Sequence, residues 1–257
     1  MTQTIVQDYP ILEYDDAPEA IIEPSRVIQP INISEYCVLC FFQEVIGQIC
    51  REEHCIHHLS SEIGRNPVYE IEAHGRRLAV VHPGVGAPLA AGFLEELIAL
   101  GCRKFIACGG SGVLSPEITV GHVVIPTSAV RDEGTSYHYL PAGREAYASQ
   151  EGVRALDAVL NKHHIPYVVG KTWTIDALYR ETRAKMARRK AEGCITVEME
   201  AAAFFAVAQF RGVTFAQILY GGDDISGDEW DNRDWIGGQA STREKLFWLA
   251  AEACLSL

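Results

Sequence analysis

The chain has little positive charge and no long hydrophobic run. Its 257 residues include 22 Lys and Arg against 34 Asp and Glu, which gives a formal net charge of −12 at pH 7. Nucleic acids and anionic membranes attract basic surfaces, so we expect neither as a partner. No apolar run reaches the roughly 18 residues of a membrane-spanning helix. Residues 1–7 lack a basic start followed by an apolar core, so we expect no signal peptide and a cytoplasmic location.

Motifs for disulfides, metals and nucleotide phosphates are also missing. Most of the eight cysteines lie inside apolar runs, so we expect reduced thiols in the core. Cys37 and Cys40 have CxxC spacing but fall in a strand-like run, where their side chains would face opposite sides. The glycine-rich run at 109–112 lacks both the P-loop ending and the spacing of a dinucleotide fingerprint. We therefore expect no metal and no cofactor.

Strand-like and helix-like patterns alternate through most of the chain. Residues 1–35 are acidic and rich in proline, which predicts an extended N-terminal arm. Residues 36–257 contain no internal repeat or linker and predict one α/β domain, with a central twisted sheet that is mixed but largely parallel and is flanked by helices. The expected strands are 36–42, 55–60, 68–74, 77–81, 105–108, 120–126, 167–174, 194–197 and 214–220, and the expected helices are 43–54, 88–100, 152–164, 180–192, 201–210 and 241–257.

Two carboxylates flank a methionine where the strand at 194–197 gives way to an apolar helix. Acidic side chains are rarely buried without a partner, so Glu198, Met199 and Glu200 suggest a ligand cleft. The carboxylate of Glu200 could accept hydrogen bonds from a vicinal diol, and Met199 could line the apolar face of a sugar. The alternative is a helix N-terminus at which the acids complement the helix dipole.

A second acidic motif, at 221–224, follows the expected strand at 214–220. Two glycines precede Asp223 and Asp224, which places these acids at the carboxyl end of a strand, where general acid catalysis is possible. The alternative is an Asp-rich turn without a catalytic role.

Several motifs, taken together and in order, resemble the nucleoside phosphorylase superfamily of purine nucleoside phosphorylases, uridine phosphorylases and adenine nucleosidases. The Glu-Met-Glu run resembles the ribose-binding motif of that family, and Glu200 and Asp223 have the family's spacing of 23 residues between ribose-binding Glu and catalytic Asp. The other matching segments are the glycine turn at 84–88, the strand and substrate loop at 105–114, the strand at 120–124 and the segment at 130–138.

The resemblance implies a role for each matching position. Glu200 would bind the ribose hydroxyls, Met199 would pack under the sugar, Glu198 would support that corner, and Asp223 would protonate N7 of a purine. The implied base-binding positions are Ser111, Gly112, Leu178 and Tyr179, and the candidates for the acceptor site are Gly86, Gly109, Gly110 and Arg65. The resemblance also implies a homo-oligomer, either a trimer or a hexamer.

The sequence departs from the family where phosphate would bind. The Gly-Asp-Pro-x-Arg turn is missing, and Ala107 and Gly110 stand where an Arg and a Ser or Thr are expected. Glu44 stands where the nucleosidases carry the acid that activates water. We therefore expect cleavage of the N-ribosidic bond of a nucleoside, with a purine favoured and uridine possible. Phosphate is the acceptor by family default, hydrolysis with Glu44 as the base is the alternative, and a non-catalytic nucleoside-binding protein is a third possibility.

Overall fold

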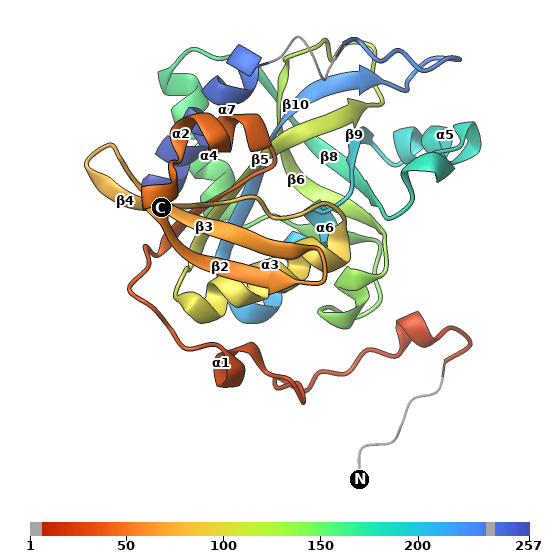
Figure 1. Ribbon diagram of the computed structural model, residues 1–257. Coiled ribbons are helices and arrows are strands. Elements are labelled where there is room, and N and C mark those ends of the chain that lie inside the picture. The colour runs from red at the N-terminus through yellow and green to blue at the C-terminus, as the bar shows by residue number, and fades with distance from the viewer. Residues whose placement is uncertain (1–6, 235–239) are drawn as a thin grey trace.

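The computed structural model describes residues 7–234 and 240–257 (Figure 1). Its longer helices are α2 (Gln43–Ile49), α3 (Ala87–Leu100), α4 (Gln150–Lys162), α5 (Arg183–Ala191), α6 (Ala201–Arg211) and α7 (Ala240–Leu255). Its strands are β1 (Tyr36–Cys40), β2 (Cys55–Ser61), β3 (Gly64–Ala73), β4 (Arg76–Val81), β5 (Lys104–Val113), β6 (Val123–Asp132), β7 (Glu145–Tyr147), β8 (Tyr167–Ile175), β9 (Cys194–Glu198) and β10 (Thr214–Asp224).

One mixed sheet organises the molecule. Its strands follow the order β10-β6-β8-β9-β5-β1-β4-β3-β2, and β10 also pairs with β5, so the pairings from β10 through β6, β8, β9 and β5 close on themselves. Both β1 and β10 run parallel to β5. The carboxyl ends of these three strands therefore meet at one edge of the sheet, which is where ligands collect in α/β folds.

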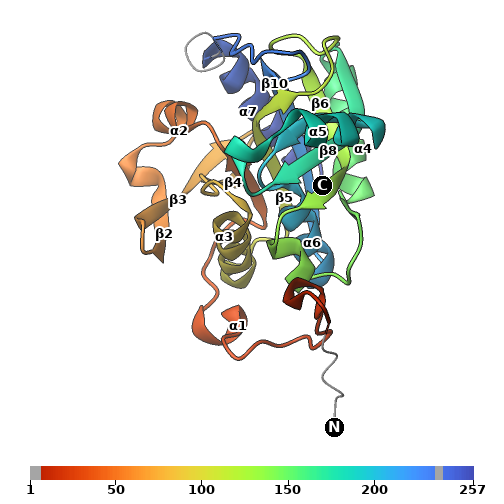
Figure 2. The ribbon, with the colours of Figure 1, turned by 90° about the vertical axis from the view of Figure 1, so that its right-hand side faces the viewer.

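Helices cover both faces of the sheet, as the sequence predicted. One apolar cluster includes side chains of α3 and α6, and a second includes side chains of α2, α4 and α7. In Figure 1 and Figure 2 the helices α2, α4 and α7 lie in the upper part of the molecule, and α3 and α6 lie below them. The helix α6 is apolar all round, with Ala201 to Ala208 buried, which is the pattern of a helix that is enclosed by the core.

Two central strands are longer than the sequence indicated. The strand β5 continues through Gly109 and Gly110 to Val113, and β10 continues through Gly221 to Asp224. Glycine lowers strand propensity, so both runs were expected to leave the sheet. Pairing between the two strands, up to Asp224 opposite Val113, holds these segments extended instead. The short strand β7, which pairs with β6, was not predicted.

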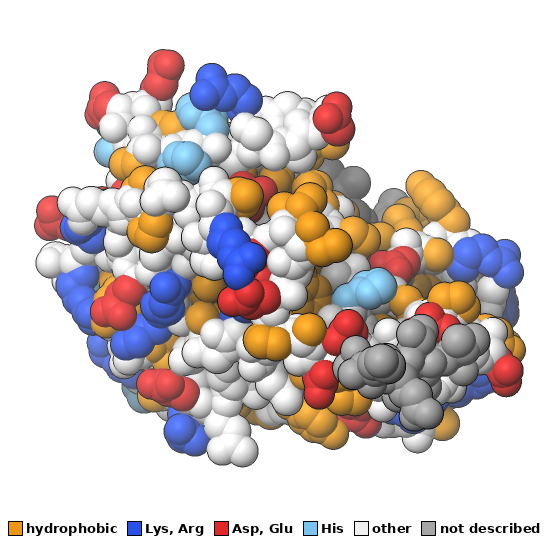
Figure 3. Space-filling model, turned by 90° about the horizontal axis from the view of Figure 1, so that it is seen from below, with side chains coloured by type: hydrophobic (Ala, Val, Ile, Leu, Met, Phe, Trp, Pro, Cys, Tyr) orange, Lys and Arg blue, Asp and Glu red, His pale blue; other side chains and the backbone are white. Residues whose placement is uncertain are grey.

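The described part of the N-terminal arm lies against one end of the domain and contains η1 (Pro10–Leu12) and α1 (Pro24–Val27). Glu23 in the arm accepts a hydrogen bond of 3.0 Å from Arg211 of α6, whose Nε also donates to Glu95 of α3. Other side chains of the arm are exposed, among them Ile21 and Ile22. Figure 3, which shows this face, has hydrophobic side chains scattered among charged ones. The division of the chain at residue 35 stays a prediction.

Among the helices in the described ranges, none combines the length and the apolar character that crossing a membrane requires.

Candidate active site

The Glu-Met-Glu run lies at the junction of β9 and α6, as the sequence indicated. The carboxylate of Glu198 accepts hydrogen bonds from the backbone N–H groups of Glu200 (2.7 Å) and Ala201 (2.6 Å), and from the Thr174 hydroxyl (2.6 Å). It therefore caps the start of α6, where the helix dipole favours negative charge. Glu198 fixes the backbone on which Glu200 stands, and Met199 is half-buried between the two acids.

Glu200 is 5% exposed, and no cation of residues 7–234 or 240–257 forms an ion pair with this buried acid. Within the described residues, its carboxylate accepts hydrogen bonds from backbone N–H groups, those of Gly86 at 2.6 Å and of Met199. Gly86 has a φ of 91°, a conformation that favours glycine, and precedes the first turn of α3. Burial, followed by the charge of Glu198, raises the pKa of Glu200 to about 8. Burial also raises the pKa of Glu198, which leaves this corner able to hold protons near neutral pH.

Asp223 lies where β10 departs from regular pairing. Gly221 pairs with Ser111 and Asp224 pairs with Val113, so β10 carries one extra residue at this point. Such a bulge redirects a side chain. An Oδ atom of Asp223 accepts a hydrogen bond of 2.7 Å from the indole of Trp230.

The predicted base-binding residues of β5 lie beside Asp223. A Cβ atom added at Gly112 would lie 3.6 Å from an Oδ atom of Asp223, and the buried Ser111 hydroxyl donates to the carbonyl of Tyr220. Asp224 differs from its neighbour, because its carboxylate binds Arg233 and the backbone N–H of Ser226. The bulge therefore directs the two adjacent acids differently. Asp223 faces Gly112, whereas Asp224 forms bonds with the loop that follows.

Leu178 and Tyr179 lie in the short helix η4 (Leu178–Arg180) after β8, where their side chains are 52% and 94% exposed. The residue that follows this helix, Glu181, was not predicted. It is half-buried, and its carboxylate has no hydrogen-bond partner within 7–234 and 240–257. Burial, and then the nearby charge of Asp223, raise the pKa of Glu181 to about 7. The sequence placed Glu181 inside the helix expected at 180–192, whereas the structure places it between η4 and α5.

Glu44 stands in the first turn of α2, immediately after β1, and is paired with a cation. Its carboxylate accepts a hydrogen bond of 2.6 Å from Arg243, which lies in the first turn of α7. The Nε of Arg243 also donates to the Tyr220 hydroxyl at 3.0 Å. Partial burial works to raise the pKa of Glu44, but the hydrogen bond and charge of Arg243 outweigh it, and the pKa lies below its ordinary value. Sequence reasoning missed Arg243, since it lies 199 residues from its partner.

The glycines of β5 lie in a strand and not in the loop that was expected. A Cβ atom at Gly109 would lie 3.0 Å from the Phe41 ring, and one at Gly110 would lie 3.2 Å from the Tyr220 ring. These glycines were expected to bring backbone N–H groups close to a ligand from a loop. They lie within a strand instead, and aromatic rings of the protein occupy the space beside them.

Arg65 remains apart from the residues described so far. It is exposed on β3 opposite Ser60, and its side chain makes no hydrogen bond or ion pair with any described residue. At the end of β4, half-buried His82 was not predicted as a site residue. Its ring lies 6.0 Å from that of Phe41, and burial lowers the pKa of its imidazole.

Comparisons with known proteins extend over almost the whole chain. Residues 35–252 match the profile of the phosphorylase superfamily. A guanosine phosphorylase from Halorubrum lacusprofundi is 28% identical over 212 residues, which cover 82% of this chain and 81% of that protein.

Solved structures share the fold. A uridine phosphorylase from Vibrio fischeri aligns with a TM-score of 0.74 at 21% identity, over 91% of this chain and 98% of that one. An AMP nucleosidase from Bacteroides thetaiotaomicron aligns with a TM-score of 0.71 at 20% identity, over 89% of this chain and 90% of that one. With the profile match across most of its length, the chain belongs to the phosphorylase superfamily, as its motifs predicted.

Proposed function

We propose that the protein is an enzyme that cleaves the N-ribosidic bond of a nucleoside. The observation that carries this proposal is Glu200, a buried carboxyl group whose described hydrogen-bond partners are backbone N–H groups. A vicinal diol supplies the hydroxyl donors that this carboxyl group lacks. The related guanosine and uridine phosphorylases act on ribosides, which agrees with a sugar at this position.

The chemistry requires an acid at the leaving base. As the bond between C1 of the ribose and the base nitrogen breaks, the sugar gains positive charge and the base gains negative charge. Asp223 is the residue we assign to protonate the base, with a purine favoured and uridine possible. Neighbouring Glu181, whose pKa is raised to about 7, is a second carboxyl group able to hold a proton there near neutral pH.

The acceptor is phosphate or water, and one observation favours each. Membership of the phosphorylase superfamily favours phosphate, with Gly86, Gly109, Gly110 and Arg65 as the candidate ligands. The contact between Glu44 and Arg243 favours water, because it places an anionic acid at the end of β1. No cofactor is required in either case.

We further propose a cytoplasmic homo-oligomer, a trimer or a hexamer, whose ligand is a small-molecule nucleoside and not a nucleic acid or a membrane. Exposed apolar residues of the N-terminal arm, such as Ile21 and Ile22, support burial of this segment against another subunit.

The test is a screen of guanosine, inosine, adenosine, uridine and adenosine 5′-phosphate for release of free base, with and without phosphate. We expect release from at least one of these ribosides. Binding of a riboside without base release under either condition would favour a non-catalytic nucleoside-binding protein.

A further inference from the structure

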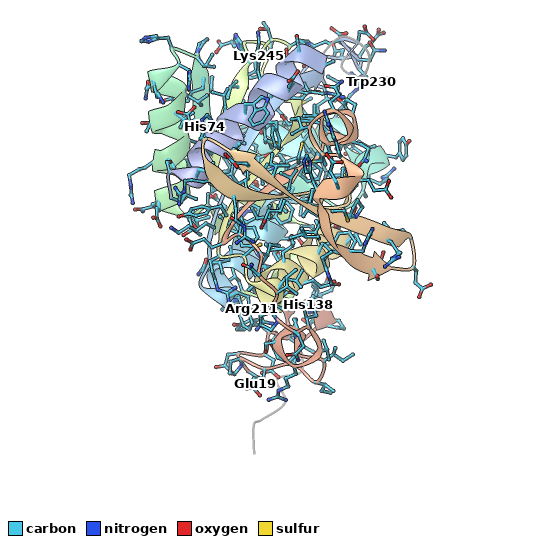
Figure 4. All side chains as sticks on the ribbon, turned by 60° about the vertical axis from the view of Figure 1, so that its left-hand side comes forward. Glu19, His74, His138, Arg211, Trp230 and Lys245 are labelled. Atoms are coloured by element: carbon cyan, nitrogen blue, oxygen red, sulfur yellow. The ribbon has the colours of Figure 1, made fainter. Side chains whose placement is uncertain are left out.

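The two carboxylate oxygens of Asp223 have different surroundings. Oδ2 accepts a hydrogen bond of 2.7 Å from the indole Nε1 of Trp230, and no other side chain in residues 7–234 and 240–257 donates to this carboxylate. Oδ1 faces Gly112, where an added Cβ atom would lie 3.6 Å from it. Figure 4 shows Trp230 and Glu19 of the N-terminal arm toward opposite ends of the molecule, so the arm takes no part in this contact.

We propose that Trp230 is a positioning residue for the catalytic acid, which keeps Oδ2 of Asp223 free of hydrogen and holds the acidic proton on Oδ1, toward the base. This inference deepens the proposed function and rests on it. An indole N–H group donates and cannot accept, so a hydrogen on Oδ2 would point at another hydrogen. The proton of Asp223 therefore has one place while the contact lasts, and that place faces Gly112, a predicted base-binding position.

The proton transfer then starts from a single atom. As the bond between C1 of the ribose and the base nitrogen breaks, its electron pair passes to the base, and the base takes the proton from Oδ1. The acceptor, phosphate or water, supplies the electron pair of the new bond to C1. The O–H bond of Asp223 breaks and leaves a carboxylate, which takes a proton from solvent before the next turnover.

The same contact stabilises the transition state more than the bound substrate. A hydrogen bond to a charged acceptor is stronger than one to a neutral carboxyl group. The bond from Trp230 therefore gains strength as Asp223 loses its proton. An interaction that strengthens on the way to the transition state raises kcat and leaves KM nearly unchanged.

The loop that carries Trp230 is fixed against the end of β10. The backbone of Asp231 pairs with that of Asp224 through two hydrogen bonds, of 2.8 and 3.0 Å. Arg233 donates to the carboxylate of Asp224 and, at 2.8 Å, to the backbone carbonyl of Ile118. The Trp230 side chain is 64% exposed, so these contacts of its loop, and not burial, place the indole beside the acid.

The segment between η4 and α5 also contacts this loop. Arg183, the first residue of α5, donates to the carboxylate of Asp228 at 2.9 Å. In the same segment, Glu181 lies close enough to Asp223 for their charges to interact. The short helix η4, which carries two predicted base-binding side chains, ends directly before Glu181. The acid, the indole and this helix thus surround the same part of the site.

The experiment replaces Trp230 by Phe, which keeps an aromatic ring and removes the N–H group. Steady-state kinetics on a riboside that the wild type cleaves should show kcat lowered about 10-fold, the loss expected for one hydrogen bond to a charged group, and KM changed by less than about 2-fold. Thermal melting checks that the variant folds. If Trp230→Phe does not fold, Trp230→Leu, which also lacks a donor, takes its place with the same expectation.

A double substitution separates this role from support of the loop. In Asp223→Asn there is no acidic proton to place, so adding Trp230→Phe should lower the residual kcat by less than about 2-fold. A residue that only supports the loop would cause the same loss of about 10-fold with and without Asp223→Asn.

The matched control is Trp248→Phe. Trp248 is another exposed indole, and it lies on α7 beside a cavity that His74 and His163 also line. The control makes the same chemical change at a position without a contact to Asp223 in the part of the chain that the structure describes. It should leave kcat and KM at their wild-type values.

Two results would overturn the inference alone. One is a wild-type kcat in Trp230→Phe, and the other is an equal loss from Trp230→Phe in the presence and absence of Asp223→Asn. Absence of base release by the wild type from every riboside would instead overturn the proposed function, and this inference with it.

Discussion

The two ends of the site use the same residue type in opposite electrostatic settings. At the proposed ribose end, Glu198 and Glu200 are buried together, and their only described hydrogen-bond partners are backbone N–H groups and one hydroxyl. Burial raises the pKa of both acids. At the acceptor end, Glu44 lies 2.6 Å from Arg243 and its pKa is lowered.

This difference separates two kinds of carboxyl chemistry within one protein. A carboxyl group that keeps its proton near neutral pH can both donate to and accept from sugar hydroxyls. A carboxylate held anionic by a guanidinium group can only accept, which is what a general base must do. The environment, more than the residue type, therefore assigns the roles.

The test with the largest expected effect makes one substitution at each end of the site and compares the loss of activity. Glu44→Gln should lower the phosphate-free rate about 10²–10⁴-fold, because an amide cannot take a proton from water. Glu200→Gln keeps an oxygen for the Gly86 N–H and should lose about 10-fold, the value of one hydrogen bond of about 1.4 kcal/mol. Steady-state kinetics on the best riboside compare the two variants, and equal losses would contradict the division of roles.

A second test concerns the acid between the two ends. Asp223→Asn should reduce kcat by about 10² or more and change KM little, because a general acid acts mainly in the transition state. Asp224→Asn is the matched control, since that neighbour binds Arg233 and the following loop. If the control lost activity and Asp223→Asn kept it, the catalytic acid would be one residue further along the chain.

The support beneath the ribose end can be weakened separately. Thr174 donates to Glu198 at 2.6 Å and accepts from the backbone N–H of Ala202 at 2.9 Å. Thr174→Val removes the partner of the Ala202 N–H and of Oε1 of Glu198, whose Oε2 keeps its two backbone donors, and should lower the free energy of unfolding by about 1–3 kcal/mol. Denaturant unfolding measures this loss, and an unchanged midpoint would mean that water or a shifted side chain replaces the hydroxyl.

The smallest expected effect is the pH dependence of stability. A buried acid whose pKa is raised binds its proton more tightly in the folded state, so stability falls as pH rises from about 5 to about 8. The melting temperature of the wild type should therefore fall over this range, and Glu200→Gln should flatten the curve. Glu44→Gln should leave the slope from pH 5 to 8 as it is, because the lowered pKa of Glu44 acts at more acidic pH.

The sequence predicted the position of the acids at the proposed ribose end. At the proposed acceptor end it predicted only one of the two charged residues. A short motif at the start of an apolar helix identifies Glu198 to Glu200, because strand, turn and helix are adjacent in the chain. Glu44 was found through its position after a strand. Its cation was not, because no local pattern links Arg243 to a residue 199 positions away.

Sequence reasoning placed the ends of β5 and β10 too early, because both strands contain glycine pairs. The runs Gly109–Gly110 and Gly221–Gly222 have low strand propensity, and only pairing between β5 and β10 keeps them extended. Glu181 was missed for a related reason. Its acidic side chain precedes a basic, mostly exposed helix, and only the folded chain brings it near Asp223.

Protein synthesis proceeds from the amino terminus, and Arg243 lies near the end of the chain. It is therefore synthesised after the other residues of the proposed site. The contact between Gly86 and Glu200 spans 114 residues, whereas the contact between Glu44 and Arg243 spans 199. Both partners of the first contact therefore leave the ribosome before the helix that carries Arg243, so the surroundings of Glu44 are the last part of the proposed site to be completed.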